Sequence, residues 1–79
     1  MTRMISVRPA PAGWAVQIDD ATGALAFRAG GQAEAAARKL AQRFAAMGEG
    51  AEVRIYMRDG ALAGRFYAPP AQALEPAAA

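Results

Sequence analysis

The sequence contains no cysteine and no histidine, and Ser6 is its only serine. Without histidine it lacks the usual general base and the commonest metal ligand. Without cysteine it can form neither a disulfide nor a thiolate metal site. Nucleophilic catalysis of the triad type is therefore excluded by the residue inventory. We expect a protein that is not an enzyme and that has no catalytic residues, no cofactor and no bound metal.

Long apolar runs are also lacking. Polar side chains interrupt the first eight residues, and Arg38 and Lys39 break the longest alanine-rich stretch. The sequence therefore shows neither a signal peptide nor a membrane-spanning segment, and the absence of cysteine fits a reducing compartment. We expect a cytoplasmic protein, monomeric and without a membrane partner.

The length of 79 residues allows one hydrophobic core and hence one domain. We assign residues 1–68 to this domain. Pro69 and Pro70 end the last apolar pattern, and Leu74 is the only large apolar residue beyond them. Residues 69–79 are therefore expected to form a disordered tail rich in proline and alanine.

The segment from Gly31 to Met47 has the clearest periodicity in the chain. Apolar residues recur at intervals of three and four, which predicts one amphipathic helix with glycines before and after it. Small alanine side chains would let this helix lie close to a flat surface, with Leu40 and Phe44 as its two large apolar side chains. The apolar stripe consists of Ala33, Ala36, Ala37, Leu40, Ala41, Phe44 and Met47.

Alternation of apolar and polar residues predicts five short strands. They lie at residues 4–8, 14–19, 24–28, 52–58 and 61–67. A turn at residues 20–23 joins the second strand to the third as a hairpin. Asp59-Gly60 predicts a second hairpin with a type I′ turn, whose register places Met57 opposite Leu62 and Arg54 opposite Arg65.

These elements predict an α+β fold. One helix packs on one face of a four- to five-stranded antiparallel sheet, in the order β-β-β-α-β-β. The predicted core takes the large apolar residue at each inward position: Ile5, Val7, Trp14, Val16, Ile18, Leu25, Phe27, Leu40, Phe44, Val53, Ile55, Met57, Leu62 and Phe66.

Two patterns are compatible with an ion. Asp19, Asp20 and Thr22 could hold a hard cation, but three oxygens in such a segment are usually turn formers. Gly30-Gly31 could present backbone N–H groups to an anion at the start of the helix. No phosphate-binding glycine motif accompanies them, so we interpret these glycines as the start of the helix.

The predicted outer face of the sheet is rich in arginine and tyrosine, the residue types enriched at binding hot spots. A solvated face without function is the plain interpretation, and a surface for a protein or for single-stranded nucleic acid is the functional one. Arg8 and Gln17 also fall on this face. The candidate partner-binding residues are Arg28, Arg54, Tyr56, Arg58, Arg65 and Tyr67.

Several motifs between residues 13 and 60 form a family pattern. They are Gly13-Trp14-Ala15-Val16, Gln32-Ala33-Glu34-Ala35, the strand from Gly50 to Ile55, and Arg58-Asp59-Gly60. This pattern resembles a family of small uncharacterised bacterial domains with Gly-Trp-x-Val and Arg-Asp-Gly motifs. The chain departs from it at Gly30-Gly31, where the family has a Thr or Ser cap. The motifs imply the fold rather than a function.

In size and overall character the chain is also similar to small phage-encoded anti-CRISPR proteins, in particular inhibitors of type I and possibly type I-C systems. This resemblance implies binding to a Cas protein subunit of the type I Cascade complex, which stops Cascade from binding target DNA. Seven acidic against nine basic residues do not suit DNA mimicry, so docking on a protein surface is expected. In that case the repulsion between Arg54 and Arg65 would be relieved by an acidic partner.

Two alternatives stay open from the sequence. The chain could instead be a small bacterial module that binds nucleic acid or another protein. The interface could also lie on the polar side of the helix, which carries Glu34, Arg38, Gln42 and Arg43.

Overall fold

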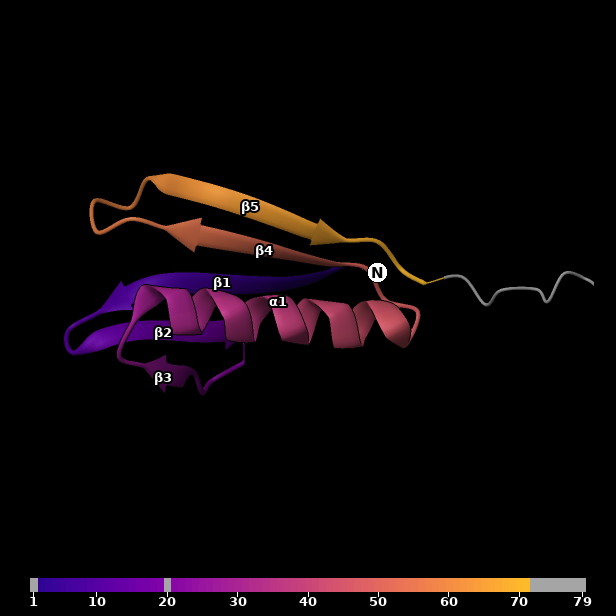
Figure 1. Ribbon diagram of the computed structural model, residues 1–79, viewed down its shortest axis with the longest axis horizontal. Helices are drawn as coiled ribbons and strands as arrows, with labels where there is room; N and C mark the ends of the chain where they lie inside the picture. Colours follow the sequence, from indigo (N-terminus) through magenta and orange to yellow (C-terminus); the bar gives the residue numbers. More distant parts are fainter. Residues whose placement is uncertain (1, 20, 72–79) are drawn as a thin grey trace, which may run out of the picture.

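The computed structural model describes residues 2–19 and 21–71. Five strands form one sheet and a single helix covers one of its faces (Figure 1). Along the chain the elements are β1 (Arg3–Ala10), β2 (Gly13–Ile18), β3 (Leu25–Phe27), α1 (Gly30–Ala46), β4 (Ala51–Tyr56) and β5 (Leu62–Ala68). The predicted α+β class, the order of elements and the single helix are confirmed.

The sheet is mixed, and the prediction of an entirely antiparallel sheet is wrong at one pair. Its spatial order is β3-β2-β1-β4-β5, and β1 pairs with β4 in parallel, with Ile5 opposite Val53. The reason lies in the connections. Two reversals make β3 run in the direction of β1, and α1 then returns the chain across the sheet before β4 begins. β4 must therefore run parallel to β1, as the arrows in Figure 1 show.

The helix packs against the sheet through its smallest side chains. Ala33, Ala37, Ala41 and Ala45 are buried at a spacing of four residues. The first three confirm the predicted alanine contact, whereas Ala45 was not predicted and the predicted Ala36 is only half-buried. They lie over a sheet face on which Ile5, Val7, Val16 and Val53 are fully buried. Leu40 and Phe44 pack beside this seam and are half-buried.

Some predicted core residues are exposed. Leu25, Met57 and Leu62 all have large exposed fractions, and so has Met47 at the C-terminal end of the helix. Leu25 lies in β3, which is only three residues long and forms an edge of the sheet. The buried Ala51 and Ala68, at one end of β4 and β5, were not predicted. Ala51 and Ala68 lie opposite each other. Just beyond Ala68, the Ala71 N–H donates to the Ala45 carbonyl of the helix, so backbone and helix are close at this end of the sheet.

The turn between β4 and β5 explains the exposure of Leu62. Arg58, Asp59 and Gly60 form a three-residue loop: the Met57 N–H donates to the Ala61 carbonyl, and the Gly60 N–H donates to the Met57 carbonyl. Gly60 has φ +88°, a left-handed conformation that glycine adopts without steric cost.

The predicted two-residue type I′ turn is therefore wrong. A bulge shifts the register so that Tyr56, and not Met57, lies opposite Leu62. A shift of one residue moves a side chain to the other face of the sheet. The predicted pairing of Arg54 with Arg65 is confirmed.

The two ends of the helix are closed in different ways. Ala29 is the N-cap, and no side chain caps the first turn. A Cβ at Gly30 would lie 3.0 Å from the Trp14 indole, so glycine lets the helix start against this ring. At the C-terminal end, the N–H groups of Gly48 and Glu49 donate to the carbonyls of Ala45 and Phe44, the pattern of a Schellman motif.

Arg3 joins several elements at this same end of the molecule. Its Nε lies 3.3 Å from Asp19 Oδ2 and 3.5 Å from Glu49 Oε1, and its guanidinium lies over the Phe44 ring. Asp19 also accepts a hydrogen bond from the Met4 N–H. Beyond β5, the Ala71 N–H donates to the Ala45 carbonyl. The disorder predicted for the tail falls, from residue 72 onward, outside the described residues.

Candidate partner-binding face

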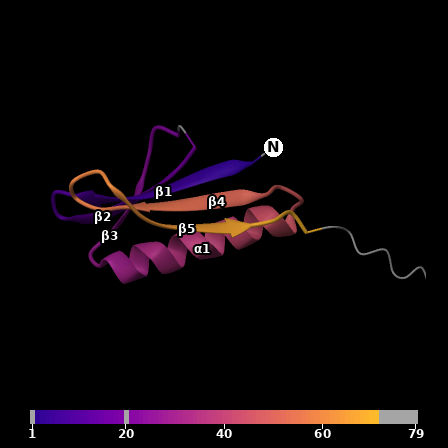
Figure 2. The same ribbon diagram turned by 90° about the horizontal axis from the view of Figure 1, so that it is seen from above.

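The face of the sheet opposite the helix carries most of the predicted binding residues. Figure 2 shows α1 on one side of the sheet only, so the other side, here called the outer face, has no helix over it. Alternation along β1, β4 and β5 directs Arg8, Arg54, Tyr56, Arg65 and Tyr67 to this face.

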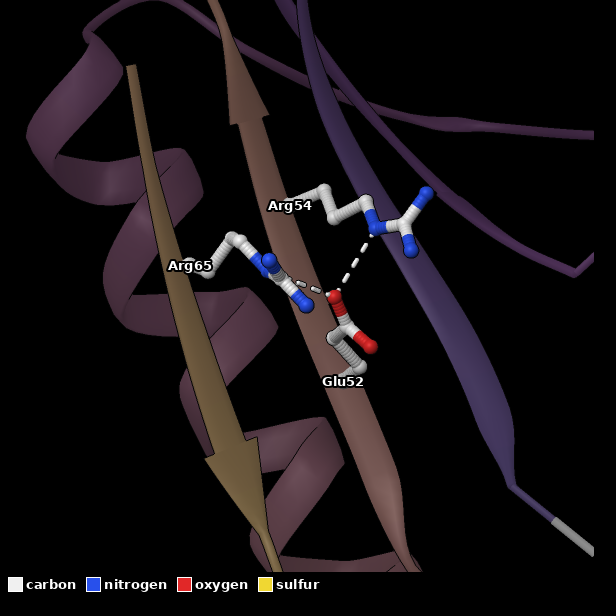
Figure 3. A network of polar contacts seen from close by, with 3 residues as sticks. All are labelled: Glu52, Arg54 and Arg65. Atoms are coloured by element: carbon white, nitrogen blue, oxygen red, sulfur yellow. Dashed lines mark hydrogen bonds and ion pairs between the residues drawn. The ribbon is translucent and has the colours of Figure 1, made fainter. Parts of the chain in front are cut away.

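A three-residue network lies on the β4–β5 side of the outer face. Glu52 Oε2 accepts hydrogen bonds from Arg54 Nε at 2.8 Å and from Arg65 Nε at 3.0 Å. Figure 3 shows the carboxylate between the two guanidinium groups, with α1 behind the sheet. The Glu52 side chain is only 15% exposed, whereas that of Arg65 is 60% exposed. The acid is therefore the inner member of the network and the arginines face the solvent.

The two arginines change the ionisation of the acid. Their hydrogen bonds and charges, that of Arg54 first, lower the pKa of Glu52 below its ordinary value, against an opposing effect of burial. The same carboxylate raises the pKa of Arg54. All three groups are thus charged at neutral pH, and the network has a net charge of one positive unit.

Glu52 is the site residue that the sequence prediction missed. It lies two residues before Arg54, so the alternation of the strand already places both on the same face. The expected repulsion between Arg54 and Arg65 is not left for a partner to relieve, because Glu52 offsets it within the chain. What remains for a partner is a pair of arginines held in position.

Both tyrosines of the outer face have neighbours within the chain. The Arg8 guanidinium lies 4.2 Å from the centre of the Tyr56 ring, a cation–π contact between neighbouring strands β1 and β4. Tyr67 lies opposite Glu52 and is 52% exposed. Its hydroxyl would lie 2.7 Å from a Cβ at Gly50, so Tyr67 also covers the entry into β4.

The structure brings together four of the six predicted residues, namely Arg54, Tyr56, Arg65 and Tyr67, on β4 and β5. Arg58 lies in the exposed turn between these strands. Arg28 follows β3, and the strands β2 and β1 lie between β3 and β4. Arg28 and Arg58 therefore lie apart from these four residues.

A family model matches most of the chain. A family described as an uncharacterized protein conserved in bacteria, DUF2188, matches residues 5–65 of the 79. The chain belongs to DUF2188. The region that matches DUF2188 runs from Ile5 in β1 to Arg65 in β5. It includes the whole Glu52–Arg54–Arg65 network and stops before Tyr67.

The expectation of a small uncharacterised bacterial family is thus confirmed for this DUF2188 chain. No curated protein and no solved structure matches it. The comparisons give no support to the resemblance to anti-CRISPR proteins.

Asp19, which by its sequence is compatible with a cation but is interpreted as a turn former, has another role in the described part of this DUF2188 domain. Asp19 has φ +51°, and its carboxylate accepts a hydrogen bond from the Met4 N–H and forms an ion pair with Arg3. Asp20 lies outside the described residues. Among residues 2–19 and 21–71, no three acidic side chains cluster as a metal site would require. No helix in these ranges is long and apolar enough to cross a membrane.

An apolar pocket of about 340 Å³ lies beside β3, away from the Glu52–Arg54–Arg65 network. Val16, Ile18 and Leu25 line it from the face that the helix covers, together with small residues of the loop between β2 and β3. Figure 2 shows this loop turned away from α1. The helix therefore does not reach the end of this hairpin, which accounts for the exposure of Leu25.

Proposed function

We propose that this DUF2188 domain is a protein-binding module that uses its outer face to dock on an acidic partner surface. One observation carries the proposal. Glu52 holds Arg54 and Arg65 by one hydrogen bond each, so both guanidinium groups are ordered before a partner arrives. Ordering long side chains in advance removes part of the entropy cost of binding. Arginine and tyrosine are also the side chains that contribute most at hot spots.

A role without catalysis is part of this proposal. It is supported by the residue inventory, which has neither histidine nor cysteine. The groups on the outer face are arginines and tyrosines around one engaged carboxylate, an arrangement that suits recognition more than proton transfer.

The more specific form of the proposal names the partner. In this form the chain is an anti-CRISPR protein that binds a Cas subunit of a type I Cascade complex in the bacterial cytoplasm and blocks target DNA binding. The resemblance in overall sequence character and the positive charge of the outer face support it.

The test inverts the charge of the network without breaking it. The triple variant Glu52→Arg, Arg54→Glu, Arg65→Glu keeps one central charge between two opposite ones, whereas reversing the arginines alone would place three acids together. The matched control is Lys39→Gln, Arg43→Gln, two neutralisations on the exposed side of α1 that change the net charge by the same two units. Co-elution with purified Cascade and a target-DNA binding assay provide the measurements.

We expect the inverted network to weaken binding by about 2 kcal/mol, or some 30-fold, and the helix control to bind as the wild type does. Equal loss in both variants would indicate general charge attraction. Loss in the helix control alone would move the interface to α1. If the wild-type chain co-elutes with no type I complex, the specific form is wrong.

A nucleic-acid partner is the second candidate, and one observation favours it. Arginines reach the outer face from β1, β4 and β5, and Arg28 follows β3, so positive charge extends across the strands. Binding to nucleic acid falls steeply with salt because bound cations are released. A gel-shift titration with a single-stranded oligonucleotide at two salt concentrations separates this candidate from protein docking.

A further inference from the structure

The two edges of the sheet differ greatly in length. β3 has three residues, whereas β5, at the opposite edge, has seven. An edge strand leaves one row of backbone N–H and C=O groups without a partner strand, and short edges are one way in which proteins avoid further pairing. Within the described residues, β5 therefore offers the longer free edge.

Arginines stand on both sides of this edge. Arg65 points to the outer face, and on the helix side the Arg38 guanidinium lies 4.8 Å from the centre of the Phe66 ring. Leu62 and Tyr67 add exposed apolar surface along the same strand. Arg38 is paired with Glu34 at 2.9 Å, whereas Arg65 shares Glu52 with Arg54, so the excess positive charge lies on the outer side of the edge. An incoming strand would thus meet this charge on one face, an arginine paired with Glu34 on the other, and apolar contacts between them.

β5 is also fixed at both ends. The three-residue loop with its bulge sets the start of the strand, and the hydrogen bond from the Ala71 N–H to the Ala45 carbonyl holds the chain just beyond its end. A strand held in this way gives its edge to a partner without first being ordered, which lowers the entropy cost of pairing.

The charge of the edge selects among possible occupants. Pairing two copies of the chain through β5 would place the Arg65 side chains of both copies on one face of a joined sheet, and like charges on paired strands destabilise them. A strand with acidic side chains gains attraction instead. The charges therefore favour an acidic segment of another protein.

We propose that the partner contributes an extended acidic segment that adds to β5 as a sixth strand. This inference rests on the proposed function, because it says how the acidic partner is held. Main-chain hydrogen bonds to β5 supply the affinity, and alternate side chains supply the specificity. The residue opposite Arg65 is acidic, and the residue opposite Phe66 is apolar.

The experiment uses a peptide as long as β5 that alternates glutamate and valine. One control has lysine in place of glutamate, and the other carries N-methyl groups on alternate residues, which block hydrogen bonding along one side. Amide exchange and chemical shifts of the full chain are followed by NMR. The glutamate peptide should slow exchange about tenfold at the β5 amides that point away from β4, and both controls should fail.

The variant Arg65→Glu sharpens the test, and Arg28→Glu beside the other edge is its matched control. Arg65→Glu should reverse the preference towards the lysine peptide, whereas Arg28→Glu should keep that of the wild type. Equal binding of the N-methylated peptide, or shifts confined to the outer face, would overturn strand addition and leave face docking intact. Protection of β5 without peptide, with a doubled mass in solution, would show pairing between copies instead.

No binding of any peptide would also overturn strand addition. The proposed function fails separately, if the inverted Glu52–Arg54–Arg65 network binds the protein partner as the wild type does.

Discussion

The inner and outer faces of this sheet are made by the same strands, yet they are stabilised in opposite ways. On the inner face, Ile5, Val7 and Val53 are fully buried beneath alanines, and small volumes decide the fit. On the outer face, one engaged carboxylate holds two exposed arginines. The inner face therefore has little tolerance for added volume, whereas a change of charge on the outer face should lower the free energy of unfolding only slightly.

The largest effect is expected where the helix lies closest to the sheet. Ala37→Leu adds a large side chain at a fully buried position and should lower the free energy of unfolding by about 1–3 kcal/mol. Ala35→Leu, at an exposed position of the same helix, is the control and should be nearly neutral. Urea denaturation measures both. Equal stability of the two variants would show that the seam is not tightly packed.

A smaller effect is expected at the Glu52–Arg54–Arg65 network of the outer face. Glu52→Gln removes the charge that pairs with Arg54 and Arg65. It should cost about 1 kcal/mol at pH 7, because solvent screens these ion pairs: the side chains of Arg54 and Arg65 are 38% and 60% exposed. The free energy of unfolding at several pH values gives the measurement.

The pH dependence of this effect has a definite sign. The pKa of Glu52 is lowered in the folded protein, so its contribution is complete at neutral pH. It disappears as the pH falls through the ordinary glutamate value of about 4.3 and then through the lowered folded value. Wild type and Glu52→Gln should therefore converge in acid. A constant difference between them down to pH 2–3, well below that ordinary value, would contradict the network.

The smallest effect is expected at the end of the β2–β3 hairpin, on the inner face but beyond the reach of the helix. Leu25→Ala should change the free energy of unfolding by less than about 0.5 kcal/mol, since this side chain is already exposed. Thermal melts of both proteins compare them. A loss of more than about 2 kcal/mol, the cost of a buried leucine, would show that Leu25 belongs to the core.

Local patterns predicted the elements well, and the failures have identifiable causes. One face of a helix or strand is buried, and the local geometry of the element sets which residues share that face. The periodicity of residues 31–47 and the alternation in β1, β2 and β4 can therefore be recognised without knowing the neighbouring elements. The parallel pairing of β1 with β4 depends instead on how three connections add together. The exposure of Leu62 depends on one additional loop residue, since Asp59-Gly60 fits both a two-residue and a three-residue turn.

The candidate site could be predicted in part. The pairing of Arg54 with Arg65 follows from the register of the hairpin and was found. Glu52 was missed because only arginines and tyrosines, the residue types enriched at hot spots, were predicted as binding residues of this face. The alternation of β4 places Glu52 on the same face as Arg54. The contact of Arg8 with Tyr56 requires β1 and β4 to be adjacent, which the antiparallel prediction did not provide.

The central place of β1 determines when this domain can fold. β1 is the first strand to be synthesised, yet it pairs on one side with β2 and on the other with β4, which follows the helix. Bringing β1 and β4 together closes a long loop, which lowers the conformational entropy of the chain before the sheet is complete. As long as β4 has not been synthesised, one side of β1 lacks its partner strand, so the native sheet can be completed only once β4 is available.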